Sequence, residues 1–175
     1  GMMGLFDGLS PTSDTGSTAE LARWLDCPIL LVADAAAMAR SISALALGYK
    51  TFGPELRFGG LLCNFIGSEG HLKLLRQARP VIEILGGLPR TDQHRFTERH
   101  LGLEAAQAES LPQADLDFWA GQAESFINLD RLLQVATAAP PLEMPAAEST
   151  PSPAGSCRIG IARDAAFSFY YLDNL

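Results

Sequence analysis

Polar and glycine-rich stretches follow the apolar runs of this sequence, and they carry the residues whose types could do chemistry. They are Asp7 with Gly8, Asp34, the segment 64–67 that starts at Asn64, and the segment 86–90 that ends at Arg90. In an open parallel sheet a ligand lies outside the carboxyl ends of the strands, where such segments meet. We therefore expect these four segments to converge at one edge of a sheet and to form a site there.

Two aspartates are candidates within this set. Asp7 lies in a glycine turn after an apolar stretch. There a carboxylate can hold Mg²⁺ or orient a substrate group beside nucleotide phosphates. The alternative is an aspartate that stabilises a tight turn, which the spacing alone favours. For Asp34 the favoured interpretation is a cap on the helix that follows.

Hydroxyl and amide side chains offer two further binding roles. Ser17 and Thr18 would stand at a helix N-terminus, whose backbone N–H groups suit an anion, although an ordinary helix cap is the favoured alternative. Asn64 can read an adenine edge because an amide both donates and accepts hydrogen bonds. A turn-forming asparagine explains Asn64 equally well.

Histidine and cysteine chemistry is not indicated. The histidines are His71, His94 and His100, and the cysteines are Cys27, Cys63 and Cys157. Neither set has the spacing of metal ligands, and no cysteine has the histidine and acidic partners that would activate it as a nucleophile. An odd number of widely spaced cysteines favours free thiols in a reducing compartment, which predicts the cytoplasm. The sequence also has no G-x-x-x-x-G-K-[ST] loop to hold a triphosphate.

Composition narrows the class of protein. The 175 residues are 47% hydrophobic and 19% charged, which suits a packed core and not a disordered chain. The net charge of −7 argues against nucleic acid and against a membrane surface as partners. No apolar run has the roughly 18 residues of a membrane span.

The elements that must position these residues read as an α/β fold. Apolar runs at 28–33, 58–66 and 81–85 predict strands, and the first reads as a strand covered on both faces. Residues 17–20 have capping-box spacing and open a helix with Leu21, Trp24 and Leu25 facing inward. Further helices are expected after Asp34, from Ser68, and over 114–135. Strands that alternate with helices predict a parallel sheet with flanking helices.

The ends and the linker suggest how the chain is organised. Residues 1–8 read as the end of a buried strand, 9–16 as a loop, and 91–112 as a long surface loop. We expect a first domain over 1–136, a flexible linker over 137–156, and the first strand of a truncated second domain over 157–175. Both ends read as cut from a longer protein. Exposed sheet edges can pair with those of a second copy, so a homodimer stays an alternative.

Seven ordered stretches resemble one family, cobyrinic acid a,c-diamide synthase of cobalamin biosynthesis. They are GMMGLFDG at 1–8, TGSTAELA at 15–22, PILLVADA at 28–35, NFIGSEGH at 64–71, LGGLPR at 85–90, ERHLGL at 98–103 and RIGIARDAAFSFYY at 158–171. The resemblance implies part of a P-loop NTPase-type, dethiobiotin synthetase-like domain. It also implies a glutamine-hydrolysing ligase that uses ATP and Mg²⁺ to amidate the a- and c-acetate carboxylates of a corrinoid through acyl phosphates.

The resemblance also assigns residues. Asp7 matches a substrate- or Mg²⁺-site carboxylate, and Asn64 matches an adenine contact. Pro89 and Arg90 match a loop over the base. Ser17, Thr18 and His100 are weaker matches on the substrate side. The phosphate loop, and the cysteine, histidine and glutamate of the glutaminase domain, have no counterpart among these residues, so we expect the chain alone to turn over neither ATP nor glutamine.

The sequence departs from the family pattern in places, and alternatives stay open. Phe65 and Ile66 stand where arginine and valine are usual, and Gly70 stands where arginine is common. One alternative is a cobyric acid synthase-like amidotransferase, and another is a non-catalytic interaction module of the same fold. Cobyrinic acid, hydrogenobyrinic acid and a related nickel tetrapyrrole are all open as acceptors.

Overall fold

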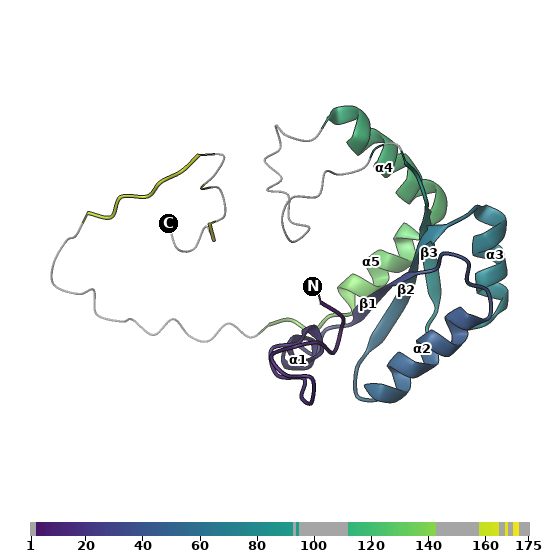
Figure 1. The fold of residues 1–175 in the computed structure, drawn as a ribbon, viewed down its shortest axis with the longest axis horizontal. Helices are drawn as coiled ribbons and strands as arrows, with labels where there is room; N and C mark the ends of the chain where they lie inside the picture. Colours follow the sequence, from purple (N-terminus) through teal and green to yellow (C-terminus); the bar gives the residue numbers. More distant parts are fainter. Residues whose placement is uncertain are drawn as a thin grey trace.

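A three-stranded parallel sheet forms the centre of the fold in the computed structural model, which describes residues 3–92, 94, 112–142, 158–164, 167, 170 and 171. The strands are β1 Ile29–Asp34, β2 Phe58–Ile66 and β3 Ile84–Pro89, in the order β1-β2-β3. The helices are α1 Thr18–Trp24, α2 Ser41–Phe52, α3 Glu69–Gln77, α4 Gln113–Phe126 and α5 Leu129–Thr137. The predicted fold class, an α/β parallel sheet with flanking helices, is confirmed (Figure 1).

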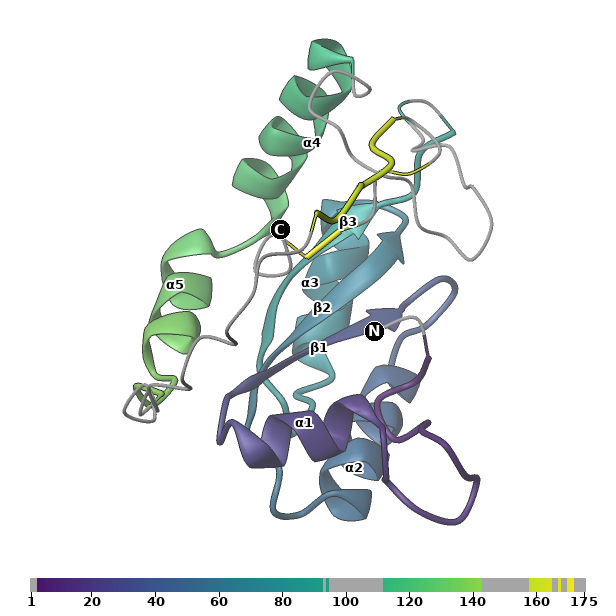
Figure 2. The same ribbon diagram turned by 90° about the vertical axis from the view of Figure 1, so that its left-hand side faces the viewer.

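The main core lies between one face of the sheet and the helices α2 and α3. Leu31, Leu61 and Cys63 point into it from the strands, and Ile42 and Leu75 meet them from the helices. Helices α4 and α5 lie on the other side of the sheet (Figures 1 and 2). Because the three strands are parallel, their carboxyl ends all lie at one edge of the sheet.

Strand β1 is covered on one face only, so the prediction of two covered faces is wrong for it. Ile29, Leu31 and Ala33 are buried, whereas Val32, on the opposite face, is 62% exposed. Helices α4 and α5 pack against β3 and β2 on that side. An unbroken apolar run signals a strand, but it does not show how far neighbouring helices extend across the sheet.

The N-terminal segment differs from its prediction in two ways. Residues 3–8 form turns and not the end of a strand. Helix α1 begins at the Ser17 cap as expected, but Leu21 and Trp24 are exposed, and Ala19 and Ala22 are the residues buried against the rest of the fold. Ala19 and Ala22 pack in a small cluster with Ile29 of β1 and Leu56, so the inward face of α1 is not its most hydrophobic one.

The long helix predicted over 114–135 is two helices. It breaks at Ile127, which forms an antiparallel bridge with Gly86 of β3. The next residue, Asn128, donates its backbone N–H to the Leu85 carbonyl at 2.9 Å and caps α5 by accepting from the Arg131 N–H. Apolar residues keep their helical spacing from α4 into α5, because both helices face the same sheet. Periodicity alone therefore does not reveal the break at Ile127.

Boundaries shift in the remaining elements. The third strand starts at Ile84 instead of residue 81, and it includes Gly86 and Gly87, which the sequence placed after it. Residues 158–164 are not assigned to a strand, contrary to expectation. Most of the loop 91–112 and of the linker 137–156 lies outside the described residues, so the division into domains stays a prediction. No helix within the described ranges is long and apolar enough to cross a membrane.

Candidate functional site

The carboxyl ends of β1 and β2 place two polar side chains next to each other. Asp34 and Asn64 are partners in the parallel register, and the Ala35 N–H donates to the Asn64 carbonyl at 2.8 Å. Ala33 and Cys63, one residue earlier in each strand, point into the α2–α3 core. Because successive side chains alternate between faces, Asp34 and Asn64 both lie on the opposite face. The edge therefore offers a carboxylate and an amide side by side.

An aromatic ring and a cation complete this edge. Phe65 is 42% exposed and has a φ of 57°, a left-handed backbone conformation that is uncommon for a bulky residue. The guanidinium of Arg90, just after β3, lies 5.9 Å from the centre of the Phe65 ring, and the Arg90 N–H donates to the Ile66 carbonyl. A cation over an aromatic face is a favourable pair. The Phe65–Arg90 pair and the neighbouring Asn64 are residue types suited to a flat ligand that has hydrogen-bonding groups along its edge.

Asp34 itself closes the turn that leaves β1. Its Oδ1 accepts a hydrogen bond from the Ala36 N–H at 2.8 Å, and α2 begins seven residues after Asp34, at Ser41. The prediction that Asp34 caps the next helix is therefore wrong, because the chain makes a separate turn first. The Asp34 side chain is nevertheless exposed at this end of β1.

His71, for which no role was expected, joins two of the loops at this edge. Its Nδ1 accepts from the Gly67 N–H at 3.0 Å, and its Nε2 lies 2.6 Å from the Met38 carbonyl oxygen. Gly67 follows β2, and Met38 lies in the loop after β1. The signal available in the sequence was the spacing of His71 three residues after the Ser68 cap, where a side chain can reach back past the helix start.

Asp7 lies elsewhere. Its Oδ2 accepts from the Gly4 N–H at 3.0 Å, and the neighbouring Phe6 packs on Tyr49 and Phe52 at the end of α2. That end of α2 leads into the start of β2, so these contacts lie at the amino-terminal edge of the sheet. The predicted convergence holds for the segments after β1, β2 and β3, and not for Asp7 and Gly8.

Three predicted site residues remain: Ser17 and Thr18 at the start of α1, and His100. Ser17 is buried, and its Oγ accepts from the Glu20 N–H, while the Glu20 carboxylate accepts from the Gly16 N–H at 2.7 Å. The Ser17 hydroxyl therefore serves as the helix cap. Thr18 is exposed at the first position of α1. His100 lies outside the described residues.

Sequence comparison identifies relatives along the whole chain. It is 44% identical over 175 residues to the cobyrinate a,c-diamide synthase of Leptospira interrogans, 42% identical over 178 residues to that of a Synechococcus species, and 40% identical over 178 residues to that of Syntrophotalea carbinolica. The chain belongs to this family. It spans 38% to 39% of the length of these three relatives. No family model and no solved structure matches the chain.

The family resemblance implied Mg²⁺, and the described residues do not make a complete site for it. Within the described ranges no three histidine, cysteine, aspartate or glutamate side chains gather to hold a metal ion. The Asp7 carboxylate accepts from the Gly4 N–H and the Asp34 carboxylate from the Ala36 N–H, so each of these carboxylates is engaged in its own local turn. A single carboxylate can hold Mg²⁺ only together with phosphate and water oxygens, so no step is assigned to the ion here.

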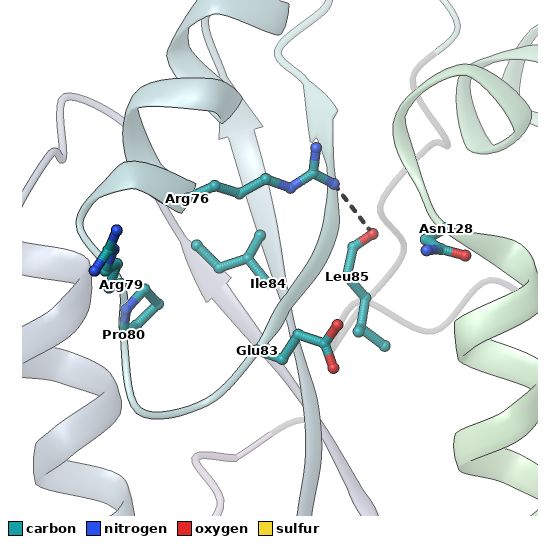
Figure 3. Close-up of a pocket in the computed structure, with 7 residues that line it drawn as sticks. All are labelled: Arg76, Arg79, Pro80, Glu83, Ile84, Leu85 and Asn128. Carbon is teal, nitrogen blue, oxygen red and sulfur yellow. Dashed lines mark hydrogen bonds between the residues drawn. The ribbon is translucent and has the colours of Figure 1, made fainter.

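A cavity of about 460 Å³ lies away from the candidate edge of this family member, near the start of β3 (Figure 3). Arg76 at the end of α3 donates to the Leu85 carbonyl across it, at 3.4 Å. The Glu83 carboxylate is paired with Arg131 of α5 at 3.0 Å. Arg76 and Glu83 of the cavity lining connect the segment that ends in β3 to α3 and α5, so we do not place the candidate site there.

Proposed function

We propose that this chain contributes the nucleotide-base side of an ATP-dependent, glutamine-hydrolysing amidotransferase that amidates the a- and c-acetate carboxylates of cobyrinic or hydrogenobyrinic acid. The observation that carries the proposal is the 44% identity to a cobyrinate a,c-diamide synthase along all 175 residues. Because the chain spans 38% of that relative, the reaction of the whole protein is inferred and extends beyond the residues described.

The edge after β2 and β3 is suited to a nucleobase. The Asn64 amide can donate to and accept from the edge of a purine. The exposed Phe65 ring and the Arg90 guanidinium next to it offer a face on which a flat base can stack. Pro89, the last residue of β3, holds Arg90 at this position without adding a donor of its own. These residues would orient ATP from its base end.

The proposed chemistry explains why ATP is needed. A carboxylate is a poor acyl donor, and phosphorylation turns one of its oxygens into a leaving group that ammonia from glutamine can displace. Transfer of this kind depends mainly on positioning and on charge stabilisation. In that scheme Asn64, Phe65 and Arg90 contribute positioning of the nucleotide, whereas the groups around its phosphates come from parts of the protein that this chain does not supply.

A graft tests the proposal. The corresponding segment of the Leptospira interrogans relative is replaced by this chain, and the hybrid is supplied with ATP, Mg²⁺, glutamine and cobyrinic acid. We expect mass spectrometry to detect the a,c-diamide. The Asn64→Ala hybrid should show a KM for ATP raised about 10-fold, the effect of losing one or two hydrogen bonds to the base. Gln77→Ala, at the far end of α3, is the matched control and should leave the KM unchanged.

Other results would redirect the proposal. A hybrid that amidates other side chains of the corrinoid would favour the cobyric acid synthase-like alternative. A folded hybrid that consumes no ATP would refute the proposed role and favour an interaction module. The 175-residue chain alone should consume neither ATP nor glutamine above a blank, since its sequence has no phosphate loop and no counterpart of the glutaminase cysteine, histidine and glutamate that the resemblance implies.

A further inference from the structure

His71 makes three hydrogen bonds, one through its backbone N–H and two through its ring. No other described residue at this edge makes these three bonds together. Its backbone N–H donates to the Ser68 Oγ at 3.1 Å, which is the cap of α3. Its ring nitrogens reach Gly67, after β2, and Met38, in the loop after β1. Those loops adjoin Asn64 and Asp34, the register partners at the ends of the two strands.

The geometry fixes the tautomer of the His71 ring. The Gly67 N–H can only donate, so Nδ1 must be the acceptor and carry no proton. In a neutral ring the proton is then on Nε2, which donates it to the Met38 carbonyl oxygen at 2.6 Å. Both ring nitrogens are therefore used, one as an acceptor and the other as a donor.

The contact of the His71 ring with Met38 joins two separate loops and does not lie within one helix. Met38 and His71 are 33 residues apart in sequence. Met38 packs against the main core, while Leu72, the neighbour of His71, is buried in that core. The His71 ring is partly buried, and both segments that the bridge joins are anchored in this core.

We propose that His71 is a positioning residue that fixes the loop after β1 relative to the turn after β2. It thereby holds together the two loops that follow Asp34 and Asn64 at the candidate nucleotide edge. The bridge itself rests on the described geometry alone, and its consequence for nucleotide binding rests on the proposed function.

The bridge is tested on the 175-residue chain without any ligand. Long-range nitrogen–proton NMR spectra of the imidazole should show the Nε2–H tautomer, and a neutral ring with its proton on Nδ1 would overturn the proposal. His71→Ala should make the Gly67 amide exchange about 10-fold faster, as expected for one lost hydrogen bond. In His71→Asn the amide oxygen can still accept from Gly67, so much of the protection should return. Lys73→Ala, on the same helix and exposed, is the matched control and should change nothing.

The consequence is tested by introducing the same variants into the hybrid with the Leptospira interrogans relative and measuring the KM for ATP. We expect His71→Ala to raise this KM about 10-fold and His71→Asn to recover most of the loss. Equal KM values of the unmodified hybrid and the His71→Ala hybrid would refute the positioning role. If the unmodified hybrid consumes no ATP, the proposed function fails, and the tautomer and the Gly67 exchange still decide whether the bridge exists.

Discussion

Replacing Gly86 by alanine should undock α4 and α5 from the sheet. A Cβ at this position would lie 2.4 Å from the Phe126 carbonyl oxygen and 2.6 Å from the Ile127 Cα. Real Cβ atoms do not come so close to other heavy atoms, so the chain must move. Both contacts are to backbone at the joint between the two helices, and no side-chain rotation can relieve them.

The cost follows from what the joint holds. Overpacking in a well-packed site costs about 1–3 kcal/mol. A displaced joint also weakens the Gly86–Ile127 bridge and the bond from the Asn128 N–H to the Leu85 carbonyl, at about 1 kcal/mol for each hydrogen bond. We therefore expect Gly86→Ala to lower the free energy of unfolding by about 2–4 kcal/mol. With a urea m-value of about 2 kcal/mol/M, the unfolding midpoint should fall by about 1–2 M.

Tryptophan fluorescence in urea provides the assay. Trp119 lies on α4 and reports on its docking, and a Trp24→Phe background removes the second signal, from the exposed tryptophan of α1. Gly121→Ala is the matched control, because Gly121 lies in α4 with nothing within 4 Å of its added Cβ. It should be stabilising by about 0.5–1 kcal/mol through helix propensity. Equal midpoints for Gly86→Ala and wild type would refute the packing argument.

Three further predictions concern the cap, a thiol and an ion pair. Ser17→Ala should cost about 1 kcal/mol in urea unfolding by removing the cap of α1, and no shift in midpoint would contradict the capping role. Burial raises the pKa of the Cys63 thiol to about 11, so at pH 8 iodoacetamide should label Cys63 far more slowly than the half-buried Cys27, as peptide mass spectrometry can measure. The backbone N–H of Glu55, and then the Arg23 guanidinium, lower the pKa of the Glu55 carboxyl. Its stabilising effect is therefore present above the unfolded pKa and lost on acidification, and Glu55→Gln should flatten the fall of Tm between about pH 5 and pH 3.

Local sequence determined the elements whose signals are short-range. The Ser17 cap and the helix start at Ser68 were predicted from local sequence, because a hydroxyl at a helix start accepts a hydrogen bond from an N–H only three residues away. The apolar run of β2 was predicted with its bounds at 58 and 66, since both ends are marked by a change to polar or glycine residues. The alternation of strands and helices then sufficed for the parallel α/β class, and the ordered motifs sufficed for the family.

The tertiary structure decided features that depend on contacts between distant residues. Gly86 breaks the predicted long helix at Ile127, a partner 41 positions further along the chain, and no local period carries that information. Which face of α1 is inward, and whether β1 is covered on both sides, depend on where other elements end.

At the candidate edge, too, some features follow from local sequence and others only from tertiary packing. Asn64 and Arg90 were expected at this edge from the order of the apolar runs, whereas Asp7, with an equally suggestive sequence context, follows Phe6, which packs on Tyr49 and Phe52 at the end of α2. His71 became visible only once its ring was seen between Gly67 and Met38. Sequence fixes which groups are available and the local turns that hold them. Side chains from separate loops meet only through the packing of the whole sheet, because the free energy of that packing is shared among many distant contacts.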